Sequence, residues 1–74
     1  MIKLKIKLDK IQDIKDFVEQ ATMLDCDLDL VRDRYIIDAK SIMALFTLDL
    51  SKPVDLVIHS DEKAAAAPFQ KWIA

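Results

Sequence analysis

The sequence contains no glycine and no asparagine among its 74 residues. Average usage would give about five glycines in a chain of this size. The absence excludes every site that holds phosphate in a glycine-rich turn, including the P-loop and the dinucleotide-binding fingerprint. Any turn that needs a positive φ angle must use another residue at some cost, and aspartate is the natural candidate.

Cysteine is almost absent as well. Cys26 stands alone, which excludes an internal disulfide, and no cluster of cysteine and histidine is present that could bind a structural zinc ion. We therefore expect no metal and no cofactor. A small domain without these supports must be held together by packing, or by packing and self-association.

The chain also has no strong excess of one charge, since 11 basic and 13 acidic residues give a net charge of -2. Such a chain has no basic field for nucleic acid. Its longest apolar runs are far shorter than the roughly 20 residues that cross a bilayer, and the lysine-rich amino end has no continuous apolar segment. We expect a cytoplasmic protein that binds neither nucleic acid nor membrane.

Hydrophobic periodicity indicates the first elements. Residues 2–8 alternate between apolar residues and lysine, which predicts a half-buried strand. The spacing of the apolar residues after it predicts a helix over 10–22, with Asp9 as N-cap and Gln12 completing a capping box.

Alternation returns twice later in the chain. Residues 25–31 predict a second strand, with aspartates opposite Cys26 and two leucines, and the turn at 32–34 leads into a third strand at 35–38. A short helix capped by Ser41 follows. After Pro53, residues 54–59 predict a fourth strand.

The last segment predicts a terminal helix capped by Ser60, with Asp61 and Glu62 in its first turn. Pro68 lacks an amide hydrogen and clashes with the preceding helical turn. We therefore expect the helix to span 61–67, with a kinked last turn that directs Trp72 toward the sheet.

The expected order is β-α-β-β-α-β-α in a single domain, residues 1–74. A split βαβ order of this kind predicts an α+β fold in two layers, an open-faced sandwich with helices on one face of a four-stranded sheet. The other face carries lysines, aspartates and His59, and we interpret it as a solvated surface.

The segment 38–50, DAKSIMALFTLDL, resembles the histidine-containing phosphocarrier family, HPr, of the bacterial sugar phosphotransferase system. The positions that match the family pattern are Ala39, Lys40, Ser41, Ile42, Met43, Leu48 and Leu50. Asp49 replaces a glycine of that pattern, and the segment 17–21 is similar to the family's first helix. The resemblance implies a sheet of order 1-4-2-3 with three helices on one face.

The family's phosphoacceptor residues are replaced in this sequence. Counting back from Phe17 places Lys10 at the histidine position, Gln12 at the arginine position and Asp13 at the proline position. A lysine ammonium, protonated at neutral pH, has no lone pair with which to attack phosphorus. We expect a degenerate member of the family with no catalytic residue and no histidine phosphocarrier activity.

Ser41 has two interpretations. As an N-cap it contributes about 1 kcal/mol through a hydrogen bond to a free amide. The resemblance implies the second, because in Gram-positive members the equivalent serine is phosphorylated by a kinase. One subfamily, the catabolite repression homologue, keeps this serine without the histidine. A phosphate at a helix N-terminus is physically acceptable, so both interpretations stay open.

A short amphipathic helix after Ser41 cannot bury every apolar side chain. We expect Leu45 and Leu48 to face the sheet and the remaining apolar residues to lie outside. The resemblance implies a partner-binding surface there, formed by Lys40, Ile42, Met43, Phe46, Ile11 and Lys15. The alternative is that the terminal segment around Trp72 partly covers these residues.

These observations predict a regulatory or protein-interaction module, not an enzyme. Its partner would be a transcription regulator, a phosphotransferase-system protein or a second copy of the chain. One alternative is a corepressor phosphorylated on Ser41, as in the catabolite-repression type. Another is a residual phosphocarrier component that works through some other residue.

Overall fold

A computed structural model describes residues 1–49 and 51–74. Leu50, the last position of the matched segment, lies outside the described residues. In chain order the elements are β1 (Ile2–Ile6), α1 (Ile11–Thr22), β2 (Leu28–Arg32), β3 (Tyr35–Asp38), α2 (Ile42–Phe46), β4 (Val54–Ile58) and the 3₁₀ helix η1 (Lys63–Trp72).

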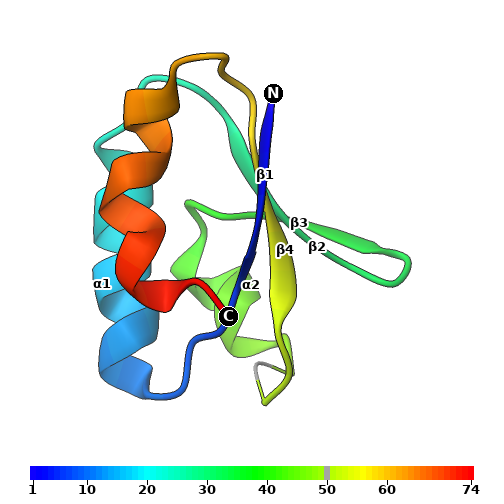
Figure 1. Ribbon diagram of the computed structural model, residues 1–74. Coiled ribbons are helices and arrows are strands. Elements are labelled where there is room, and N and C mark those ends of the chain that lie inside the picture. Colours follow the sequence, from blue (N-terminus) through cyan, green and yellow to red (C-terminus); the bar gives the residue numbers. More distant parts are fainter. Residues whose placement is uncertain (50) are drawn as a thin grey trace.

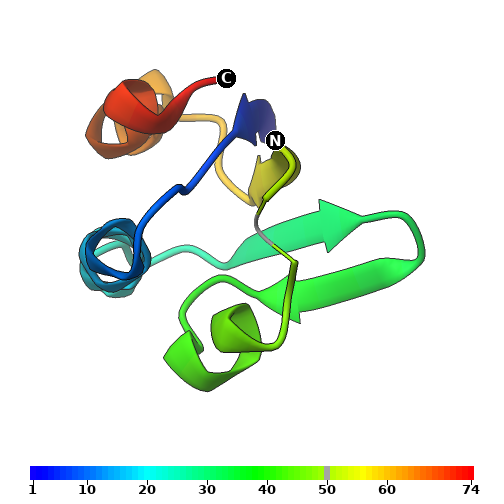
Figure 2. The same cartoon turned by 90° about the horizontal axis from the view of Figure 1, so that it is seen from below.

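The strands form one antiparallel sheet of order β1-β4-β2-β3. The three helices cover one face of this sheet, and the other face is open (Figure 1; Figure 2). The predicted α+β, two-layer architecture is therefore confirmed, together with the strand order 1-4-2-3. Within the described residues, no helix combines the length and apolar character needed to cross a membrane.

The core lies between the sheet and the helices, where the apolar side of each strand meets α1 and η1. The buried aromatic side chains Phe17, Phe69 and Trp72 form a cluster in this core. The ring centroid of Phe17 on α1 lies 5.3 Å from that of Phe69 and 5.8 Å from that of Trp72, both on η1. Rings at these separations and tilted angles gain energy beyond the area they bury. The cluster joins α1 to η1 and substitutes for the missing disulfide and metal.

The hairpin between β2 and β3 turns through Asp33 and Arg34, since Arg32 pairs with Tyr35. Asp33 has φ of 52°, in the left-handed region that favours glycine. The expectation that an aspartate would form such a turn is confirmed.

Replacing Asp33 with glycine is expected to raise the free energy of unfolding by about 0.5–1 kcal/mol, because glycine has no Cβ to clash at positive φ. Urea denaturation followed by circular dichroism measures this. Arg34→Gly is the matched control and should destabilise, because glycine there only adds flexibility to the unfolded chain. Equal effects of the two substitutions would show that Asp33 is not strained.

Three strand boundaries differ from the predictions. β4 ends at Ile58 rather than at residue 59. β1 ends at Ile6, and β2 begins at Leu28 rather than at residue 25. Cys26 therefore precedes the strand, half-buried and packed against the core. Alternation continues through 25–27, but the ladder between β2 and β4 begins at Leu28, and before it the carbonyl of Asp27 accepts a hydrogen bond from the amide of His59 at 2.9 Å. Periodicity identifies a pattern of side chains and cannot show where pairing stops.

The terminal helix differs more strongly. It begins at Lys63, and Glu62 takes the N-cap position in place of Ser60, whose hydroxyl instead accepts a bond from the Glu62 amide at 3.1 Å. The helix also continues through Pro68 to Trp72. η1 is a 3₁₀ helix, and the fixed φ of Pro68 is compatible with its dihedral angles, so that the proline removes one donor without ending the helix.

The residues that follow η1 pair with β1. The backbone amide of Lys7 donates to the carbonyl of Trp72 at 2.8 Å, and the amide of Ala74 donates to the carbonyl of Lys5 at 2.9 Å. Ile6 and Ile73 form an antiparallel bridge between them. The residues around Ile6 on the outer edge of β1 are thus paired with the carboxyl-terminal segment, whereas β3 is the other edge strand of the sheet.

Candidate functional site

The first candidate position is the start of α1. Lys10 is the N-cap residue, and the carboxylate of Asp13 accepts hydrogen bonds from the backbone amides of Asp9 and Lys10, both at 3.2 Å. The predicted capping box of Asp9 and Gln12 is wrong. The helix starts one residue later than predicted, so Asp13 is the third helical residue. Its carboxylate accepts the hydrogen bonds of the backbone amides that precede the helix.

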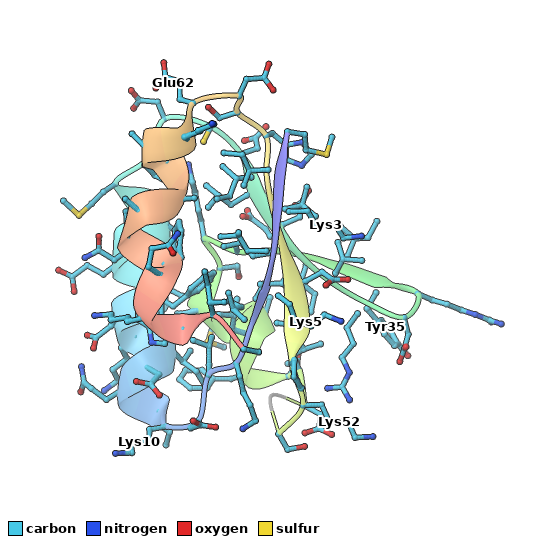
Figure 3. The ribbon with its side chains drawn as sticks, in the orientation of Figure 1. Lys3, Lys5, Lys10, Tyr35, Lys52 and Glu62 are labelled. Atoms are coloured by element: carbon cyan, nitrogen blue, oxygen red, sulfur yellow. The ribbon has the colours of Figure 1, made fainter. Side chains whose placement is uncertain are left out.

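This arrangement does not favour acceptance of a phosphoryl group. The exposed ammonium of Lys10 extends outward beyond the lower end of α1 (Figure 3). Two amides that could stabilise an anion are already bonded to Asp13, whose negative charge opposes a second anion. At the helix start, Asp13 therefore takes up two of the amides that an incoming anion would need, and the side chain at the N-cap is an ammonium.

Ser41 is the second candidate position. Its side-chain oxygen accepts a hydrogen bond from the amide of Ala44 at 3.3 Å, and its carbonyl accepts one from Leu45 at 3.1 Å. The hydroxyl group is therefore an N-cap for α2, and the predicted start of this helix is confirmed. Just before it, the carboxylate of Asp38 accepts from the amide of Lys40 at 2.9 Å.

The outer face of α2 leaves large apolar side chains in solvent. Met43 is 75% exposed and Phe46 is 49% exposed, whereas Leu45 is fully buried under the helix. Ile42 differs from the prediction because it is half-buried and packs against the core. Five residues turning by about 100° each distribute side chains around the whole helix, so Met43 and Phe46 have no core to enter.

The neighbouring start of α1 adds Ile11, which is 64% exposed, and Lys15, which lies one turn further along the same helix face. The two helices pack side by side under the sheet (Figure 2). We define the docking patch as Ile11, Met43 and Phe46, with Lys15 at its border.

The predicted contribution of Lys40 is wrong in position. Its ammonium donates to the carbonyl of Leu24 at 2.8 Å, just beyond the C-terminal end of α1. Ile11 begins the same helix, and twelve residues at about 1.5 Å each separate the two ends by about 18 Å. Lys40 therefore anchors the segment before α2 to the end of α1 and does not border Ile11.

The terminal segment does not cover this surface. Trp72 packs on Phe17 and Phe69, and Figure 2 places α1 between η1 and α2. Met43 and Phe46 are exposed in the folded chain, in which Trp72 is already packed in its final position. The alternative that the carboxyl end hides these residues is thereby disfavoured.

Sequence reasoning missed an ion pair next to α2. The guanidinium of Arg32 lies 3.7 Å from the carboxylate of Asp49 and also donates to the Asp49 carbonyl. The hydroxyl and the amide of Ser51 bond the same carboxylate and lower the pKa of Asp49, with a smaller contribution from Arg32. This pair ties the hairpin to the loop after α2, and 17 residues of separation left no sequence signal for it.

No group of three or more histidine, cysteine, aspartate or glutamate side chains is placed to hold a metal ion within residues 1–49 and 51–74.

No protein-family model matches the sequence, and no curated protein matches it. Among solved structures, HPr-C-His from Thermoanaerobacter tengcongensis is similar, with a TM-score of 0.82 and 23% identity over 99% of this chain and 91% of that one. The chain has the HPr fold. Crh, the catabolite repression protein of Bacillus subtilis, has a TM-score of 0.66 and 28% identity over 100% of this chain and 92% of its own.

The HPr fold also explains the position of the candidate residues. It brings α1 into contact with α2, although the two helices begin about 30 residues apart in the sequence. The docking patch is therefore a product of the fold and not of one continuous motif.

Proposed function

We propose that this chain is a regulatory protein-interaction module with the HPr fold that docks partners through Ile11, Met43 and Phe46 and has no histidine phosphocarrier activity. The exposure of Met43 and Phe46 on a short helix carries this proposal. Burial in a partner would remove this apolar surface from water, at a gain of about 25 cal/mol per Å².

The chemistry of the patch fits a protein partner. Methionine adapts its shape to different surfaces, and an aromatic ring supplies a large contact area at low conformational cost. Lys15 at the border would favour a partner with an acidic rim, because such charges guide encounter and orientation.

The fold neighbours support the choice of partner class. One of them, Crh, is described as a catabolite repression protein, and the sequence resembles the HPr family of the sugar phosphotransferase system, so the proposed partners are a phosphotransferase-system protein and a transcription regulator of carbon control. Such partners would place the protein in the cytoplasm. Crh is described as an intertwined, domain-swapped dimer, and a second copy of this chain is therefore also a candidate occupant.

Calorimetric titration with the first enzyme of the phosphoenolpyruvate relay and with the carbon-control regulator tests the proposal. Phe46→Asp is expected to weaken binding at least about 30-fold, the effect of losing an aromatic hot spot worth about 2 kcal/mol.

Met23→Asp is the matched control, because Met23 is 72% exposed but follows the other end of α1. It should leave the affinity unchanged. Equal affinities for wild type and Phe46→Asp would refute the docking patch, and binding of neither protein by the wild type would refute the proposed partners.

A corepressor phosphorylated on Ser41 is the second candidate function. The observation that favours it is the position of the hydroxyl group at a helix start, where an added phosphate would face the free amides of α2. Modification at Ser41 distinguishes this function from a constitutive module. A residual phosphocarrier would instead be labelled from phosphoenolpyruvate at another residue.

A further inference from the structure

The two edges of the sheet differ. The outer edge of β1 carries alternating lysines and is paired near Ile6 with the carboxyl-terminal segment. Lysines and a covering segment are two of the ways in which edge strands are kept from pairing with other chains. β3, at the other edge, contains neither lysine nor proline, and no strand pairs with its outer side within residues 1–49 and 51–74.

The backbone of β3 directs hydrogen-bonding groups toward this outer edge. The amide of Ala39 donates to the carbonyl of Leu28 at 2.9 Å, so residue 39 points its backbone groups toward β2. Successive residues of an antiparallel strand point these groups to opposite sides, so Ile36 and Asp38 direct theirs away from β2. The carbonyl of Asp38 already accepts a bond from Ser41 at 3.1 Å, which leaves the amide and carbonyl of Ile36 and the amide of Asp38 at the edge.

The side chains along this edge lie in solvent. Tyr35 is 68% exposed and Ile36 is 71% exposed, on a hairpin that projects away from the helices (Figure 1; Figure 2). Arg34 in the adjoining turn and Asp38 at the end of the strand are also exposed, and neither forms an ion pair within the described residues. Asp38 stands directly opposite Asp29 in the register, where two carboxylates repel each other.

We propose that β3 pairs with β3 of a second copy of this chain, antiparallel and about a two-fold axis that passes between the two Ile36 residues. The axis is perpendicular to the sheet, so two four-stranded sheets join edge to edge into one sheet of eight strands. Both open faces then lie on the same side, and the helices of both copies lie on the other. The amide of each Ile36 donates to the carbonyl of the other.

The side chains are complementary to themselves in this register. The residue two positions before Ile36 faces the residue two positions after it, so Arg34 of each copy faces Asp38 of the other. In the same way Tyr35 faces Ile37, and the two Ile36 side chains face each other. Opposite charges meet twice, and the remaining pairs are apolar. The added guanidinium also reduces the repulsion between the two facing carboxylates of β2 and β3.

Other arrangements lose this match. Only residues whose backbone groups point to the edge can bond one another, so the register changes in steps of two residues. One such step in either direction places Ile36 opposite a charged residue, either Arg34 or Asp38. Parallel pairing in register brings each charge next to its own counterpart. The edge therefore favours one symmetric arrangement, and self-complementarity of this kind is what an isologous interface requires.

The contact is small, because residues 34–38 of each copy supply all of it. Pairing of two sheet edges depends on backbone hydrogen bonds for affinity and on the facing side chains for register. Contacts of small area are weak and reversible, so we expect a dissociation constant of roughly 0.1–1 mM. Salt should weaken the dimer because both of its ion pairs are exposed.

Sedimentation equilibrium at low salt, over chain concentrations up to roughly 1 mM, tests this proposal. The wild type is expected to show a monomer–dimer equilibrium. Arg34→Glu and Asp38→Arg should each raise the dissociation constant at least about tenfold, because each makes two attractive pairs repulsive. An equal mixture of the two variants should dimerise again, because the two substituted residues then face each other and the two unsubstituted ones do as well.

Ile36→Pro provides a second test, because it removes the amide donor at the centre of the pair. This amide points away from β2, so a proline is compatible with the strand edge. The dimer should be lost, and circular dichroism shows whether each variant is folded. Lys3→Glu is the matched control, since it makes the same change of charge on the other edge strand and should leave the dissociation constant unchanged.

A wild type that stays monomeric at the highest concentration would overturn the proposal. So would a dimer that survives Ile36→Pro or either charge reversal, which is the result expected of association through the docking patch or by exchange of segments. Loss of the dimer in Lys3→Glu, or failure of the mixed variants to associate, would contradict the proposed register.

Discussion

Replacing Phe17 with alanine is expected to lower the free energy of unfolding by about 3–5 kcal/mol. Phe17 is fully buried, and its ring contacts both Phe69 and Trp72. The substitution removes the centre of the cluster that joins α1 to η1. Domains of this size have a total stability of about 4–11 kcal/mol, so the substitution should remove a large share of it.

Urea denaturation monitored by tryptophan fluorescence measures the loss, because Trp72 reports the cluster directly. Phe46→Ala is the control, since this phenylalanine is half exposed on α2 and should cost about 1 kcal/mol or less. A similar loss of stability in both variants would contradict the assignment of the core to the aromatic cluster.

Incubation with phosphoenolpyruvate and the enzymes of the phosphotransferase relay is expected to add no phosphoryl group to this protein. Lys10 has no lone pair for the transfer, and Asp13 already occupies two amides of the helix start. Intact-mass spectrometry measures the result, with a genuine HPr in the same reaction as positive control.

Incubation with the serine kinase and ATP, in parallel, determines the role of Ser41. An adduct that disappears in Ser41→Ala would establish the corepressor function. An adduct from phosphoenolpyruvate would contradict the absence of carrier chemistry. If neither donor gives an adduct, the role of Ser41 is limited to capping α2 through the hydrogen bond from the amide of Ala44.

Periodicity was sufficient for the elements of the fold and their two layers, whereas the strand order 1-4-2-3 came from the resemblance to the HPr family. Alternation at residues 2–8 and helical spacing at 10–22 arise from one buried face each, and every element that they predict is present within one or two residues. Ser41 also marked its helix correctly, because a capping hydroxyl acts on an amide three residues away and needs no tertiary information.

The incorrect predictions depend on contacts between distant residues. The β2 boundary is set by its partner strands, and the ammonium of Lys40 is fixed by Leu24, 16 residues earlier. Pro68 appeared to end a helix only because an α-helix was assumed, whereas packing of Phe69 and Trp72 on Phe17 favours a 3₁₀ helix that continues past it. Local sequence patterns contain no information about such contacts between residues that are far apart in the chain.

The pairing of β1 with β4 has a consequence for folding kinetics. Ile2 pairs with Ile58, and the other edge of β1 is completed only by residues 72–74. Contacts of such long range form slowly, whereas the β2–β3 hairpin can close within microseconds. During this delay β1 is an unpaired strand in a partly folded chain, and its alternating lysines protect it from pairing with β-strands of other molecules.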